Sequence, residues 1–103
     1  MNIVWTDFAV KNLKDIFDYY STNASEKVAH SIRKKILVST KRLIANPELG
    51  QLELYLERLK EQHRYILSGN YKVIYKVLNS DIIITDVFDV RQNPVKMIDT
   101  DRK

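Results

Sequence analysis

The chain has 103 residues, of which 45% are hydrophobic and 29% are charged, and these proportions are typical of one small globular domain with a single core. It has no cysteine, which excludes disulfides and thiolate metal sites, and its two histidines are too few for a multi-histidine metal cluster. No apolar run approaches the roughly 20 residues of a membrane span, and the first residues lack a signal-peptide pattern. We therefore expect one domain, residues 1–103, in a reducing cytoplasm, without a cofactor, metal or membrane partner.

The formal net charge is +4, and the basic residues are unevenly distributed. Residues 27–42 contain six lysines and arginines and no acidic residue. A second basic set is spread over the C-terminal half: Arg58, Lys60, Arg64, Lys72, Lys76 and Arg91. This distribution indicates an anionic partner without naming it.

The first half of the chain predicts a short strand followed by two helices. Residues 2–5 form an apolar run that is typical of a strand. Thr6 is a good helix-start residue, and apolar residues then recur at helical spacing as far as Tyr20. A second helix is expected from Ser25 until Asn46 and Pro47 break the pattern. Two amphipathic helices joined by a short polar link predict an antiparallel helical hairpin.

From His63 onward, apolar residues recur with period two. Strands are expected at residues 64–67, 71–78 and 82–89, separated by the turns Ser-Gly-Asn and Asn-Ser-Asp, which makes a three-stranded antiparallel meander. Residues 47–62 show no clear period, so a loop, a short helix and the approach to the next strand all stay open.

The loop length of the first hairpin decides which residues share a face, because a slip of one residue exchanges all side chains between the two faces. A two-residue loop, Gly69-Asn70, would place Arg64 and Ile66 beside Val73. We expect the three-residue loop, residues 68–70, because it gives the more apolar core face. That face then contains Tyr65, Leu67, Tyr71, Val73, Tyr75, Val77, Ile83, Thr85 and Val87.

The opposite face of the expected sheet combines basic and apolar side chains. It collects Arg64, Ile66, Lys72, Ile74, Lys76, Ile84, Asp86 and Phe88, and Arg91 follows directly after the third strand. Cations on an apolar floor suit a phosphate, or an acidic peptide laid across the sheet. The candidate residues for binding a target or partner are Arg64, Lys72, Ile74, Lys76, Phe88 and Arg91.

Less specific interpretations exist for the charged residues. Arg64 and Arg91 could pair with the nearby aspartates in ordinary surface ion pairs, which are common and weak. The run Arg33-Lys34-Lys35 is interpreted as a solvated helix face, because consecutive helical residues point about 100° apart.

Three segments together resemble the RelE/ParE superfamily of bacterial type II toxins, also called plasmid stabilisation proteins. They are the opening Val-Trp before the first helix, the sequence LIANPELG after the second helix, and the block HRYILSGNYKVIYKV followed by IIITDVFDVRQNP. The match extends over nearly the whole chain. It implies an α+β fold with a short N-terminal strand and a two-helix antiparallel hairpin packed on a curved antiparallel sheet, and a neutralising antitoxin as partner.

The resemblance also implies two alternative targets, because RelE-like members cut mRNA in the ribosome and ParE-like members poison DNA gyrase. For the nuclease, Lys72 matches a basic residue of the family, and Arg64 and Arg91 lie near two others, so these three would be catalytic. The chain departs from the nuclease pattern, because Arg64 stands where two close lysines are expected and no tyrosine follows Arg91. We therefore expect a ParE-like gyrase inhibitor; the alternatives are a ribosome-dependent mRNA endonuclease and a degenerate member that only binds its antitoxin.

Overall fold

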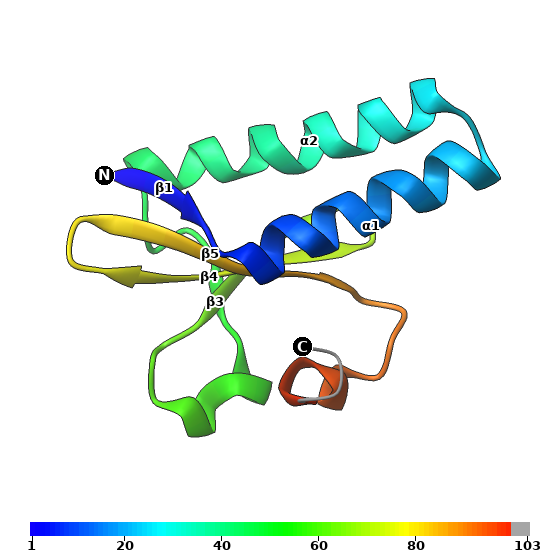
Figure 1. Ribbon diagram of the computed structural model, residues 1–103. Helices are drawn as coiled ribbons and strands as arrows, with labels where there is room; N and C mark the ends of the chain where they lie inside the picture. The colour runs from blue at the N-terminus through cyan, green and yellow to red at the C-terminus, as the bar shows by residue number, and fades with distance from the viewer. Residues whose placement is uncertain (100–103) are drawn as a thin grey trace.

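The computed structural model describes residues 1–99 and has two long helices on one face of a five-stranded sheet and two short 3-10 helices on the other (Figure 1). In chain order the elements are β1 Asn2–Trp5, α1 Asp7–Asn23, α2 Glu26–Ala45, β2 Gln51–Leu52, η1 Leu54–Leu59, β3 Arg64–Ser68, β4 Tyr71–Leu78, β5 Asp81–Asp89 and η2 Pro94–Ile98. No helix among these residues is both long and apolar enough to cross a bilayer.

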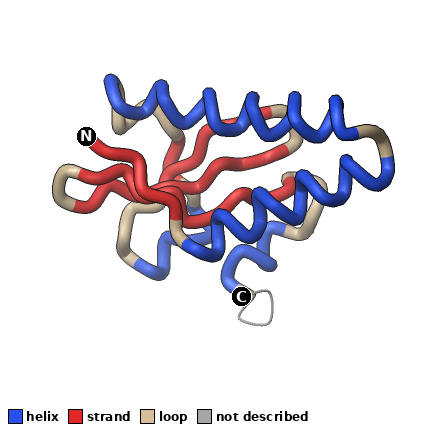
Figure 2. The backbone as a smooth tube through the Cα atoms, turned by 45° about the horizontal axis from the view of Figure 1, so that its top comes forward, coloured by secondary structure: helices blue, strands red, loops and turns tan. Residues whose placement is uncertain are grey.

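The helical hairpin predicted from the sequence is confirmed (Figure 2). Both helices begin at their expected caps. The Thr6 hydroxyl accepts a hydrogen bond from the backbone N–H of Ala9, and the Ser25 hydroxyl accepts one from that of Val28, each at 3.1 Å. These side chains satisfy backbone donors that lack a partner within the helix. Both helices then turn their apolar stripe toward the sheet.

The strand order in the sheet is β1-β5-β4-β3-β2. The predicted meander is confirmed, because β3, β4 and β5 are antiparallel neighbours. The sheet as a whole is mixed rather than antiparallel, since β1 runs parallel to β5 with Ile3 opposite Ile82. The segment left open by the sequence, residues 47–62, contains the short edge strand β2 and the 3-10 helix η1.

The predicted three-residue loop between β3 and β4 is wrong. Ser68 pairs with Tyr71, so the loop has two residues, and Gly69 adopts the positive φ of 58° that the first position of such a loop favours. Consequently Ile66 is 8% exposed on the helix side, and Leu67, expected in the core, is 58% exposed. Tyr65 likewise lies on the face away from the helices.

A β-bulge in β5 changes which residues of this strand belong to the core face beneath the helices. Ile74 pairs with Asp86 but Tyr75 pairs with Ile84, which leaves Thr85 as the extra residue. The bulge places both Ile84 and Val87 on the helix side, although their numbers differ by three. Ile83 and Thr85 therefore do not belong to the core face, contrary to expectation.

Two apolar clusters cover both faces of the central strands. The cluster beneath the helices contains Ala9, Leu13, Ile36, Leu43, Ile66, Tyr71, Val73, Tyr75, Ile82, Ile84 and Val87. The cluster on the opposite face contains Leu56, Ile74, Phe88 and Met97, with Tyr65 and Ile98 packed against it. Because η1 and η2 supply its outer layer, the face expected to be open is covered at its centre.

Candidate binding surface

Lys72 lies on the face of β4 away from the helices and is neutralised there by a buried acid. Its ammonium Nζ is 2.8 Å from the Glu53 Oε2 and 4.2 Å from the centroid of the Tyr65 ring. The Glu53 side chain is 2% exposed, and its other oxygen accepts a hydrogen bond from the N–H of Tyr55 at the start of η1. The lysine is therefore already part of a buried charge pair with a cation–π contact.

Ile74 and Phe88, expected to form an exposed apolar floor, are 0% and 1% exposed. They pack against Leu56 of η1 and Met97 of η2 in the second cluster. Lys76, on the same face of β4, is 2.9 Å from the Glu61 carboxylate. These positions contribute to the packed layer between the sheet and the two 3-10 helices.

Arg64 lies on the opposite face of the sheet, where it holds the loop between α2 and β2. Its guanidinium donates to the carbonyl of Gly50 at 2.8 Å. The Tyr75 hydroxyl reinforces this loop, because it accepts from the N–H of Gly50 at 2.9 Å and donates to the carbonyl of Pro47 at 2.7 Å. A Cβ at Gly50 would lie 2.6 Å from the carbonyl oxygen of Tyr65, so only glycine fits. Arg64 thus stabilises a loop.

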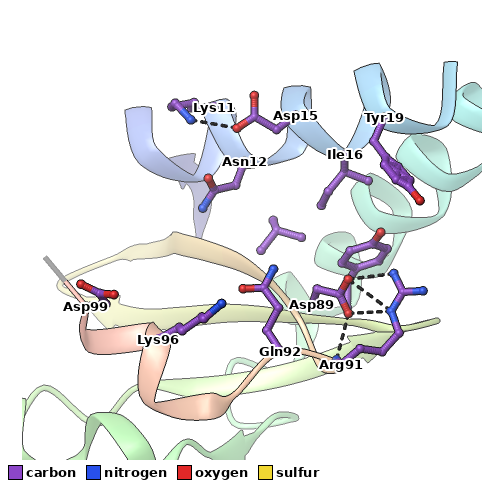
Figure 3. Close-up of a pocket in the computed structure, with 12 residues that line it drawn as sticks. Lys11, Asn12, Asp15, Ile16, Tyr19, Asp89, Arg91, Gln92, Lys96 and Asp99 are labelled. Carbon is purple, nitrogen blue, oxygen red and sulfur yellow. Dashed lines mark hydrogen bonds and ion pairs between the residues drawn. The ribbon is translucent and has the colours of Figure 1, made fainter. Parts of the chain in front are cut away.

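Arg91 follows β5 and forms a bidentate ion pair with Asp89 (Figure 3). The guanidinium Nε is 2.9 Å from Asp89 Oδ1, and the terminal nitrogen is 2.7 Å from Oδ2. These hydrogen bonds lower the pKa of Asp89 and raise that of Arg91. The Arg91 side chain is nevertheless 58% exposed, so one side of its guanidinium faces solvent.

Arg91 stands beside a polar cleft of about 720 Å³ between α1 and the C-terminal segment (Figure 3). The lining residues are Lys11, Asn12, Asp15, Ile16, Tyr19, Tyr71, Val87, Asp89, Arg91, Gln92, Lys96 and Asp99. On its inner side the Tyr71 hydroxyl donates to that of Tyr20 at 3.2 Å, and burial raises the pKa of Tyr71. The mixture of both charge signs and amide groups suits a polar polypeptide segment.

The prediction of one outward-facing cationic patch is wrong. Lys72 and Lys76 lie on the face covered by η1 and η2, Arg64 lies on the helix face, and Arg91 stands beyond the end of β5. The hairpin register separates them, since Arg64 pairs with Tyr75 and not with a residue of the lysine face. Among residues 1–99, no group of three or more histidine, aspartate or glutamate side chains is placed to hold a metal.

Two features of the site could not be predicted from the sequence. Glu53 could not be assigned as the partner of Lys72, because it lies in the segment without clear periodicity. The side of α1 that lines the cleft was partly visible in the sequence, because the helical spacing puts Lys11, Asn12 and Asp15 on one side of the predicted helix. Nothing in the sequence, however, placed that side of the helix next to Arg91.

A short strand, a helical hairpin and a five-stranded mixed sheet with a cleft beside β5 define a small α+β protein. The model of the family "ParE toxin of type II toxin-antitoxin system, parDE" matches residues 3–94. The chain belongs to this family of type II toxins, which confirms the resemblance to the RelE/ParE superfamily.

A solved structure shows the same fold. The structure described as "Chromosomal ParDE TA system from P. aeruginosa" superimposes with a TM-score of 0.73 over 87% of this chain and 96% of that chain, at 21% sequence identity. No curated protein matches the chain.

Proposed function

We propose that this chain is a toxin that acts in the cytoplasm by inhibiting DNA gyrase and is held inactive by a cognate antitoxin. Family membership supplies the class of type II toxin. The ion pair between Lys72 and buried Glu53 is the single observation that favours gyrase inhibition over mRNA cleavage.

Cleavage of mRNA by this chain would require a set of groups that the fold keeps apart. Attack of a ribose 2′-oxygen on the adjacent phosphate needs a base, an acid for the leaving 5′-oxygen and cations for the developing charge. Lys72 is already neutralised by Glu53, so it offers little net positive charge to a phosphate. Moving Lys72 away would leave a buried carboxylate without its partner, at a cost of about 3–5 kcal/mol. Arg64, on the other face, is engaged with the Gly50 carbonyl.

Arg91 is the predicted contact residue that keeps its role in this proposal. Its guanidinium is exposed, fixed in orientation by Asp89 and placed at the margin of the cleft. A carboxylate or backbone carbonyl of gyrase or of the antitoxin can accept from the side of the guanidinium that Asp89 leaves uncovered. The other five predicted contact residues, Arg64, Lys72, Ile74, Lys76 and Phe88, then serve the fold around this position.

The experiment starts with induction of the gene alone in a bacterial host, with and without an antitoxin gene found beside it. Purified protein is then added to a gyrase supercoiling reaction and to a translating extract. We expect arrested growth, inhibited supercoiling and intact mRNA. Cuts in mRNA at codon positions would overturn the proposal in favour of the endonuclease, and normal growth with soluble protein would leave only antitoxin binding.

An Arg91→Glu variant tests the contact residue. We expect at least a tenfold loss of gyrase inhibition, because a carboxylate would repel the acceptor and also Asp89. Arg58→Glu is the matched control, since Arg58 is an exposed arginine of η1 outside the cleft. Equal loss in both variants would show that net charge, and not the position of Arg91, determines inhibition.

A further inference from the structure

Helix α2 contains all of the net positive charge of this protein. It has six of the 17 lysines and arginines and one of the 13 acidic residues, so its net charge is +5 and that of the remaining chain is −1. Outside α2 the positive and negative charges nearly balance, so a net positive charge concentrated on this one helix indicates a function for it.

The cations of α2 form a straight row on its solvent side. Lys27, Lys34 and Lys41 are spaced by seven residues, about 10 Å apart along the helix and nearly in line. Each precedes by two positions a buried residue of the inner stripe, Ala29, Ile36 or Leu43, and therefore points roughly 200° away from it. Lys35 and Arg42 flank the row. We call these five exposed residues, Lys27, Lys34, Lys35, Lys41 and Arg42, the basic ridge.

The basic ridge has no acidic counterpart within residues 1–99. None of its five residues forms an ion pair or hydrogen bond through its side chain in that part of the chain. On α1, in contrast, Lys11 and Lys14 are each 2.8 Å from an aspartate one turn away. The sixth cation of α2, Arg33, lies 4.5 Å from the ring centroid of Phe17 and is thus turned toward α1.

We propose that the basic ridge binds the phosphate backbone of duplex DNA without reading its sequence. Lys27 to Lys41 spans about 21 Å, and a duplex presents one negative charge for about every 1.7 Å of its axis, so phosphates meet the whole row. The helix runs along the outer margin of the molecule, where α1 and the sheet do not obstruct a rod-shaped partner (Figures 1 and 2). The choice of DNA over duplex RNA rests on the proposed function, which places the protein at an enzyme bound to DNA.

The composition of α2 disfavours other polyanions. The core of a protein interface is depleted in lysine, whereas four of the five ridge residues are lysine. A helix lying on a membrane inserts one continuous apolar face, whereas the exposed apolar residues of α2, namely Val28, Leu37, Val38 and Ile44, are scattered around the helix among its lysines. Single strands stack on exposed aromatic rings, and α2 contains no phenylalanine, tyrosine or tryptophan.

The test is fluorescence anisotropy of a labelled random duplex of about 20 base pairs, titrated with the full chain between about 50 and 200 mM KCl. The variant Lys27→Gln/Lys34→Gln/Lys41→Gln should bind at least about tenfold more weakly at the lower salt concentration. Its slope of log K against log salt should be less steep by about 2 to 3, because each lost phosphate contact removes about 0.9. Circular dichroism verifies that the variant is folded.

Two matched variants isolate the ridge. Lys14→Gln/Arg58→Gln/Lys60→Gln has the same net charge as the first variant but leaves the ridge intact, and it should bind like the unmodified chain. Replacing the three ridge lysines with arginine should also retain binding. Equal losses in the two glutamine variants would overturn the proposal, as would absence of DNA binding or stronger binding of poly-glutamate or of phosphatidylserine vesicles. The assay contains no gyrase, so its result is independent of whether gyrase is the target.

Discussion

Lys72 and Glu53 form an ion pair whose members differ in exposure, since the lysine side chain is 18% exposed and the glutamate side chain 2%. The pair joins the middle of the sheet to the start of η1, 19 residues earlier in the chain. A lysine in an alternating strand is visible in the sequence, but the acid that neutralises it belongs to a segment whose course only the tertiary fold decides. For this reason the sequence predicted Lys72 to be a free cation, whereas in the structure it is paired with Glu53.

The loss of Lys72 should be more harmful than the loss of both charges. Lys72→Met leaves the Glu53 carboxylate buried without a counter-ion, and we expect the free energy of unfolding to fall by about 3–5 kcal/mol. In the double variant Glu53→Gln/Lys72→Met, most of this loss should be recovered. Urea unfolding at pH 7 measures both. Lys76→Met is the control and should cost about 1 kcal/mol or less, because its partner Glu61 is 48% exposed; a similar cost in both lysine variants would contradict this account.

Asp89 makes stability depend on pH through its bond with Arg91. Because the folded-state pKa of Asp89 lies below its ordinary value of 3.8, its contribution is fully present above that value and is lost as the pH falls through the folded-state pKa. The difference in unfolding free energy between the unmodified chain and Arg91→Gln should therefore be constant near neutrality and shrink below pH 3.8. Urea unfolding from neutral to acid pH measures it, and a difference that grows on acidification would contradict the ion pair.

Among the secondary-structure elements, those features that depend on residues close in the sequence were predicted correctly. Both helices and their caps follow from Thr6, Ser25 and the 3.6-residue spacing, and the three strands of the meander follow from alternation. The register was not predictable by apolarity, because both faces of the central strands are covered. Ile74 and Val73 are equally buried on opposite sides, so counting apolar residues could not distinguish the helix face.

The register can be tested with two adjacent residues of β3. Ile66→Ala should reduce the free energy of unfolding by about 2–5 kcal/mol, because it leaves a cavity beneath the helices. Leu67→Ala should change it by about 0.5 kcal/mol or less, since this side chain is exposed. Chemical denaturation of both variants measures the difference. The opposite order of costs would mean that the hairpin has the three-residue loop.

Taken as a whole, the molecule is a sheet with an apolar layer on each face. The helical layer was foreseen, and the layer made by η1 and η2 was not, because short 3-10 helices have too few residues to show a period. Met97 of η2 is 2% exposed against Phe88 and Ile74, so the C-terminal segment is part of the core. Because η1 and η2 cover this second face of the sheet, Ile74 and Phe88 are buried there and are not available to bind a partner.

Met97 and Val95 provide a matched test of this second layer, since both belong to η2. Met97→Ala should cost about 2–5 kcal/mol, as for other buried methionines. Val95→Ala should be nearly neutral, because Val95 is 55% exposed. The measurement is again the free energy of unfolding. If Met97→Ala were as neutral as Val95→Ala, η2 would not be docked on the sheet.

The pairing of β1 with β5 also affects the order in which the native protein can assemble during translation. Ile3 lies opposite Ile82, so the second strand of this parallel pair emerges from the ribosome after nearly eighty residues have been made. The two helices of the hairpin are neighbours in the chain and can pair with each other early, whereas the pairing of β1 with β5 waits for a partner distant in the sequence. A nascent chain interrupted before residue 81 would present an unfinished sheet edge, and a host cell would meet the completed toxin only once the last strand had been synthesised.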